Sequence, residues 1–70
     1  MTIKEIARCR SRAERVGMCI EWLRAREGNI TIVTLDGCVS LWINGRYEDA
    51  GPRLDALLLD ACRRVEKESK

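Results

Sequence analysis

The sequence predicts a small α+β protein: a long N-terminal helix, an antiparallel β-hairpin or three-stranded meander, and a C-terminal helix. Three observations predict this class. Apolar residues recur at helical spacing toward both ends of the chain, β-branched residues fill its middle, and that middle is divided by the dipeptides Asp36-Gly37 and Asn44-Gly45. Because the chain has only 70 residues, we expect one domain, residues 1–70, with a small core.

The first helix is predicted to run from a cap at Thr2 to about Glu27. Thr2 and Glu5 have the spacing of a capping box, in which the hydroxyl accepts from the third amide and the glutamate reaches back to the cap. Gly28 supplies a positive-φ stop. One apolar stripe follows this helix: Ile6, Cys9, Ala13, Val16, Ile20 and Leu23. The stripe serves either the protein's own core or a paired helix of another copy.

A β-hairpin is predicted for residues 30–43. Asp36-Gly37 lies between two β-branched runs, and the type I′ turn that joins such strands requires positive φ at both central residues. Counting outward from the turn pairs Leu35 with Cys38 and, at the far end, Ile30 with Ile43. Because side chains alternate along a strand, one face becomes the core face: Ile30, Ile32, Thr34, Val39, Leu41 and Ile43.

A short third strand, residues 46–48, is predicted by the second turn signal, Asn44-Gly45. Its Tyr47 would lie opposite Trp42, and an aromatic cross-strand pair contributes roughly 0.2 to 1 kcal/mol. This pair would share the face away from the core with Val33 and Leu35. We therefore expect a second sheet face that is not plainly polar.

The C-terminal helix is predicted to begin near Pro52, which suits the first helical position because it lacks an amide hydrogen. Its acidic residues Asp55 and Asp60 come early and its basic residues come late, as the helix dipole favours. The predicted buried stripe comprises Leu54, Leu57, Leu58, Ala61, Cys62 and Val65.

A second stripe on the first helix suggests a binding surface. It lies roughly 150° from the apolar stripe, at about 100° per residue, and contains Lys4, Arg8, Ser11, Arg15, Met18, Trp22 and Ala25. Met18 and Trp22 are one turn apart and are framed by arginines, and Trp, Met and Arg are enriched at protein interfaces. Two interpretations stay open: a docking surface, or a Trp22 that helps to fill the core beneath the hairpin or second helix.

On the first interpretation the chain is a non-catalytic protein-protein interaction module that acts as a stoichiometric inhibitor or adaptor. We expect a homodimer, formed through the long helix or a sheet edge. The predicted partner-binding residues are Arg8, Arg12, Arg15, Met18, Trp22, Arg26, Trp42 and Tyr47. By analogy, many phage accessory proteins that block host defence systems fit this description, and ten arginines against three lysines favour a GC-rich bacterial or phage source.

The charge distribution supports a second hypothesis, nucleic-acid binding through the arginine-rich first helix. Residues 1–26 carry seven basic and three acidic side chains, whereas residues 27–62 carry two basic and six acidic ones. Crowded arginines suit phosphate contacts, although the same asymmetry suits pairing between copies. The element order also resembles that of double-stranded RNA binding domains. That family grips phosphates with a lysine cluster at the start of its last helix, whereas residues 51–56 offer one arginine and one aspartate.

The composition argues against an enzyme, a cofactor or a metal site. The chain has no histidine to act as a near-neutral base, and no serine or cysteine has a recognisable activating partner. Its four cysteines include no CxxC pair, so we expect buried free thiols. The uncharged runs are too short to span a bilayer and the N-terminus lacks the apolar segment of a secretory signal, so we expect a cytoplasmic protein.

Overall fold

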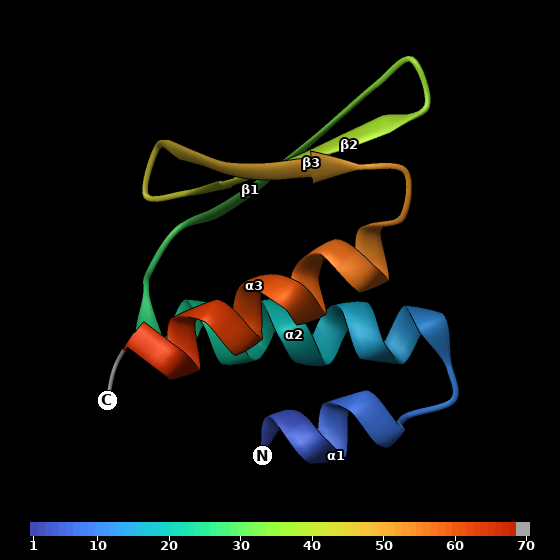
Figure 1. Ribbon diagram of the computed structural model, residues 1–70, viewed down its shortest axis with the longest axis vertical. Helices are drawn as coiled ribbons and strands as arrows, with labels where there is room; N and C mark the ends of the chain where they lie inside the picture. Colours follow the sequence, from blue (N-terminus) through green and yellow to red (C-terminus); the bar gives the residue numbers. More distant parts are fainter. Residues whose placement is uncertain (69–70) are drawn as a thin grey trace.

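The computed structural model describes residues 1–68, which form three layers (Figure 1). In chain order the elements are α1 (Ile3–Arg8), α2 (Arg12–Arg26), β1 (Ile30–Leu35), β2 (Cys38–Ile43), β3 (Arg46–Gly51) and α3 (Leu54–Glu68). The sheet lies above the paired helices α2 and α3, and the short helix α1 lies below that pair (Figure 1). The sheet is an antiparallel meander of order β1-β2-β3, so the predicted α+β class is confirmed.

The helical segment at the N-terminus is not continuous, which corrects the prediction of one long helix. Cys9 has extended backbone angles, φ −65° and ψ 127°, and ends α1. Ser11 then starts α2, because its hydroxyl accepts a hydrogen bond from the backbone N–H of Glu14 at 3.3 Å. Ser11 and Glu14 therefore repeat the cap spacing of Thr2 and Glu5, and this second cap competes with continuation of the helix.

The break allows α1 to turn back beneath the other two helices. It contacts both α2 and α3 and buries Ile3 and Ile6 against them. As a result α2 has the sheet above it and α1 below it (Figure 1). This arrangement explains why the sequence of α2 is apolar on two sides, since both sides are covered by the same chain.

The predicted hairpin register is confirmed at each of its six pairs, from Leu35 with Cys38 to Ile30 with Ile43. Both turns have positive φ at their two central residues, as a type I′ turn requires. Strand β3 is longer than predicted and carries an irregularity. Trp42 pairs with Tyr47 as expected, but Leu41 pairs with Asp49, so Glu48 is an extra, bulged residue.

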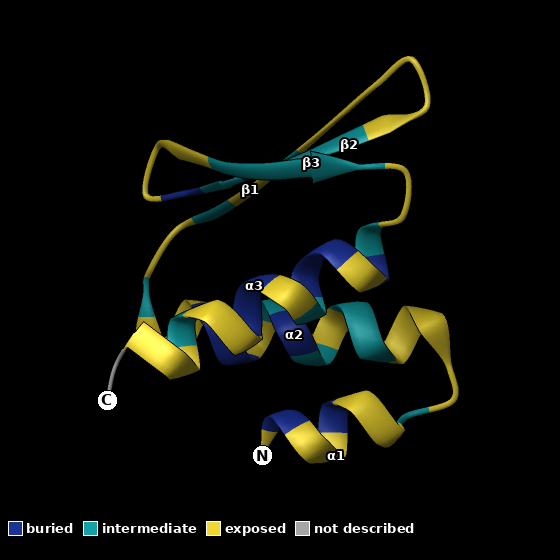
Figure 2. Cartoon of the chain, viewed as in Figure 1, coloured by how far each residue is buried: buried dark blue, intermediate teal, exposed yellow. Residues whose placement is uncertain are grey.

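One apolar core joins the sheet to the helices (Figure 2). From the predicted core face of the sheet, Leu41 and Ile43 are buried and three others pack partly against the core, but Thr34 is exposed. Thr34 lies near the β1–β2 turn, which extends beyond the helices (Figure 1). The complete set of buried apolar residues is Ile3, Ile6, Cys19, Trp22, Leu23, Leu41, Ile43, Leu57, Leu58, Ala61 and Cys62.

Two smaller predictions need correction. Helix α3 begins at Leu54, not at Pro52, because the carbonyl of Arg53 accepts the hydrogen bond from Leu57 and Pro52 lies outside the helix. Of the four thiols that we expected to be buried, Cys19 and Cys62 are buried, but Cys9 is only partly buried and Cys38 is exposed. Within residues 1–68 no helix is long and apolar enough to cross a bilayer.

Candidate protein interaction surface

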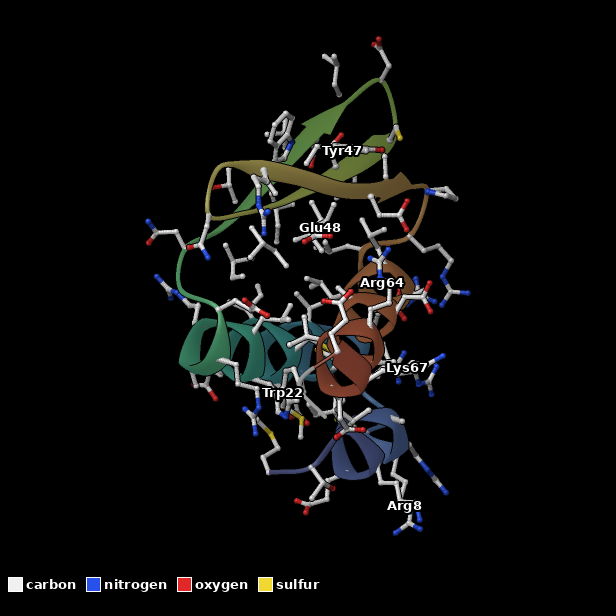
Figure 3. The ribbon with its side chains drawn as sticks, turned by 60° about the vertical axis from the view of Figure 1, so that its left-hand side comes forward. Arg8, Trp22, Tyr47, Glu48, Arg64 and Lys67 are labelled. Atoms are coloured by element: carbon white, nitrogen blue, oxygen red, sulfur yellow. The ribbon has the colours of Figure 1, made fainter. Side chains whose placement is uncertain are left out.

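Trp22 belongs to the core and is only 4% exposed. It projects from α2 on the side where α1 lies (Figure 3). Met18, one turn earlier, is also partly buried against the core. Of the two interpretations of the second stripe, the structure supports packing of Trp22 in the core. The interpretation of Trp22 as the centre of an exposed docking surface is wrong. The sequence of α2 contains no pattern that shows that α1 folds back against it, and this contact is what covers Trp22.

Arg26 covers the indole of Trp22 from the solvent side. Its guanidinium carbon lies 3.9 Å from the centroid of the Trp22 ring, and its Nη1 donates to the backbone carbonyl of Trp22 at 3.2 Å. A cation held over an aromatic face gains about 0.5 to 1 kcal/mol where it is exposed. Arg26 therefore has a packing role within α2.

Arg15 holds the helices together through Asp55. Its Nη2 donates to Asp55 Oδ2 at 2.9 Å, and its Nη1 donates to the backbone carbonyl of Cys9 in the α1–α2 connection. Arg53 also donates to this carboxylate at 3.2 Å, and Arg12 lies 4.0 Å away. Asp55 is buried at the start of α3, so one carboxylate fixes both the α1–α2 junction and α3.

The guanidinium of Arg15, assisted by that of Arg53, lowers the pKa of the adjacent Asp55 carboxyl to about 2. The sequence had indicated only an ordinary helix-dipole role for Asp55 on a helix surface. It had also assigned Arg15 to partner binding. Nothing in the sequence links these two residues, which are 40 positions apart, and only the packing of α2 against α3 brings them together.

We predict that Asp55→Asn makes the stability of the protein less sensitive to acid. The unfolded carboxyl has a pKa near 3.9, so the lowered pKa in the folded chain contributes stability that is fully present above about pH 4 and is lost as the pH falls toward 2. The gap between the urea midpoints of the wild type and Asp55→Asn should therefore narrow over this range.

Asp60→Asn, which changes an exposed carboxylate on the same helix, is the matched control and should retain the acid response of the wild type. A constant gap between the wild type and Asp55→Asn from pH 5 to 2 would contradict the role given to Asp55.

The sheet presents an apolar surface on the side away from the helices, here called the outer face. It combines alternate residues of β1 and β2 with the start of β3: Thr31, Val33, Leu35, Cys38, Ser40, Trp42 and Tyr47. Val33 is 46% exposed, Leu35 is 70% exposed and Tyr47 is 56% exposed. An antiparallel sheet covered on one face normally has polar residues on the other, so this composition is unusual.

Trp42 is the centre of the outer face. It pairs with Thr31 on one side and with Tyr47 on the other. The two aromatic rings form an edge-to-face pair with centroids 5.6 Å apart and an interplanar angle of 74°, the geometry that aromatic pairs prefer. This predicted cross-strand pair is confirmed, and it places two aromatic rings in contact on the outer face.

The predicted partner-binding residues therefore fall in separate places. Trp42 and Tyr47 lie on the outer face, whereas Arg8 lies at the far end of the molecule, below α2 and α3 (Figure 3). Arg12 is exposed at the start of α2. The structure thus does not bring these residues together into one site. The sequence signal that indicated the outer face was the alternation of Val33 and Leu35 with core residues in β1.

A groove of about 510 Å³ lies between the starts of α2 and α3 and is lined by Arg12, Ala13, Val16, Val39, Pro52, Arg53, Leu54 and Asp55. Its carboxylate is already bound by arginines. Across the described part of the chain, no three His, Cys, Asp or Glu side chains are grouped so that they could hold a metal ion.

Comparison with known proteins gave no match to a family model, to a curated protein or to a solved structure.

Proposed function

We propose that this chain is a non-catalytic protein-protein interaction module that binds a protein partner through the outer face and acts as a stoichiometric inhibitor or adaptor. One observation carries the proposal. Among residues 1–68 the large hydrophobic residues that are exposed are Met1, Val33, Leu35 and Tyr47, and the last three lie on the same face of one sheet.

The physical argument is the cost of leaving this face in water. Burying apolar surface is favourable by roughly 25 cal/mol per Å², so a partner that covers Leu35 and Tyr47 would gain affinity from both. Tyrosine and tryptophan are also the residue types that most often dominate binding energy, and the edge-to-face contact already orders Tyr47 against Trp42. The partner should therefore present an apolar patch with a polar rim.

We propose further that the chain acts as a homodimer, since a 70-residue domain has a small core and gains stability from association. Phage accessory proteins that block host defence systems work by occupying a surface in this way, and the arginine-rich composition is consistent with that setting. This part of the proposal rests on analogy of size and mode of action.

The test compares partner capture by the wild type and by the double variant Leu35→Thr with Tyr47→Thr. Threonine keeps the preference for strands but removes the apolar surface. The loss of Tyr47 should cost about 2 kcal/mol and the loss of the apolar area of Leu35 about 1 kcal/mol, so the purified partner should bind the double variant about 100-fold more weakly in calorimetry. The control is Arg8→Ala with Arg12→Ala, which should bind the partner as the wild type does.

The same pair of variants tests the nucleic-acid hypothesis. If nucleic acid is the ligand, the arginine variant should lose binding to a duplex oligonucleotide, the salt dependence should be steep, and the outer-face variant should bind normally. That result would overturn the proposed function.

A further inference from the structure

Strand β1 leaves a row of backbone groups at the open edge of the sheet. It is an edge strand, because the order is β1-β2-β3. In a hairpin closed by a two-residue turn, the pair next to the turn exchanges both hydrogen bonds and every second pair beyond it does the same. In β1 the residues of these hydrogen-bonded pairs are Leu35, Val33 and Thr31. The 2.8 Å hydrogen bond from the Asn44 N–H to the Asn29 carbonyl agrees with this assignment, since Asn29 is the next residue in the same series.

The N–H and C=O groups of the alternate residues, Ile30, Ile32 and Thr34, therefore point away from β2. An edge of this kind is a template for another strand unless charge, proline or a bulge blocks it. Strand β1 has none of these, since its six residues are uncharged, contain no proline and keep continuous register with β2.

The other edge of the sheet, strand β3, is blocked by charge and by a bulge. Strand β3 carries Arg46, Glu48 and Asp49, and Glu48 is bulged. The side chain of Asp49 accepts a hydrogen bond from the backbone N–H of Ala50 at 2.8 Å, so this N–H of β3 already has a partner. The contrast between the two edges indicates that β1 is the edge left available for pairing.

We propose that β1 pairs antiparallel with β1 of a second copy, with Ile32 opposite Ile32 of that copy, so that two sheets join into one of six strands. The inference rests on the proposed homodimer and specifies its interface. A second copy of β1 suits this edge because β1 is uncharged, so pairing the strand with itself places no like charges opposite each other. This pairing also places each threonine of β1 opposite an apolar residue of the second copy.

The register follows from hydrogen-bond geometry. If the core faces of both copies lie on the same side, opposed residues must come from the same face of the strand. With Ile32 opposite itself, Ile30 lies opposite Thr34 of the second copy, and every outward-pointing backbone group of β1 forms a hydrogen bond. The next register, centred on Val33, leaves the outward groups of Ile30 without a β1 partner, so it satisfies fewer bonds.

This register also covers apolar surface and joins the outer faces. Ile30 and Ile32 are only half-buried in the single chain, and the second copy would shield both. On the other side of the sheet, Val33 would meet Thr31 of the second copy, which makes one continuous outer face. Asp36 at the hairpin turn would lie beside Gly28 of the second copy.

The first test is the mass in solution, measured by light scattering and sedimentation equilibrium. The wild type should show twice the chain mass of 8.0 kDa. Thr34→Pro removes an N–H that points to the open edge, at an exposed position where proline is tolerated in an edge strand, so it should remain folded by circular dichroism and become a monomer. Thr34→Val keeps the N–H and should remain a dimer.

The second test fixes the register and does not depend on a proline variant that folds. In a Cys38→Ser background, chains with Thr31→Cys are mixed with chains with Val33→Cys and oxidised. In the proposed register these positions form a non-hydrogen-bonded pair with Cα atoms about 4.5 Å apart, which a disulfide can span. The mixture should give a cross-linked dimer, and neither variant alone nor the Cys38→Ser parent should do so.

A monomeric wild type would overturn both the dimer and this interface. A dimer that persists in folded Thr34→Pro, with no cross-link in the mixture, would overturn the interface alone. Cross-linking of Val33→Cys with itself would replace the proposed register by the one centred on Val33. Because Leu35→Thr with Tyr47→Thr leaves the edge intact, loss of partner binding in that variant can be separated from loss of the dimer.

Discussion

Trp22→Ala should remove a large part of the free energy of unfolding of the protein. The indole is 4% exposed within the core cluster, so its truncation should cost about 3 to 5 kcal/mol. At roughly 0.05 to 0.15 kcal/mol per residue, a chain of this length has about 4 to 10 kcal/mol in total. The variant also leaves Arg26 without the ring that it covers. Urea unfolding followed by circular dichroism measures the loss.

The matched control is Tyr47→Ala, which removes an aromatic side chain that is exposed on the outer face. It should cost about 1 kcal/mol or less, because it loses mainly the cross-strand contact with Trp42. If the two variants were equally stable, Trp22 would not be a core residue and the interpretation of α2 as a doubly covered helix would fail.

Ile6→Ala should destabilise the protein by about 2 to 5 kcal/mol. Ile6 is fully buried, although it belongs to a helix of only six residues that could not form by itself. Its burial is therefore what holds α1 beneath α2 and α3. We expect the urea midpoint to fall and the amide protons of α1 to lose protection from hydrogen exchange before those of α2.

Lys4→Ala is the control on the same helix, because Lys4 is exposed and alanine is a good helix former. It should change the free energy of unfolding by no more than about 0.5 kcal/mol. Equal stabilities of Ile6→Ala and Lys4→Ala would mean that α1 does not contribute to the core.

The sheet could be predicted from the sequence because its signals are local. Two Gly-containing turns fix the strand register through the sign of φ, and the period of two then assigns each residue to a face. The hairpin pairs and the contact between Trp42 and Tyr47 follow from these rules and are confirmed. The bulge at Glu48 was not predicted, since neither the turn dipeptides nor the alternation of side chains marks an extra residue in β3.

The first helix shows the opposite case. Ser11 and Glu14 carried a readable second cap, but a continuous apolar stripe across the same residues favoured one helix, and the two local signals conflicted. What decided between them was the burial of Ile3 and Ile6, which contact residues far away in the sequence. The candidate site moved for the same reason, since Trp22 became core once α1 covered it and the outer face remained exposed.

The sequence by itself determined the α+β class, the register of the β1–β2 hairpin and the apolar character of the outer face, because turn dihedrals and side-chain alternation act over a few residues. Only the tertiary structure decided that the first helix breaks, that Trp22 is enclosed and that Arg15 binds Asp55. Those outcomes depend on which surfaces meet when α1, α2 and α3 pack, and the burial gained there outweighs what any local pattern favours.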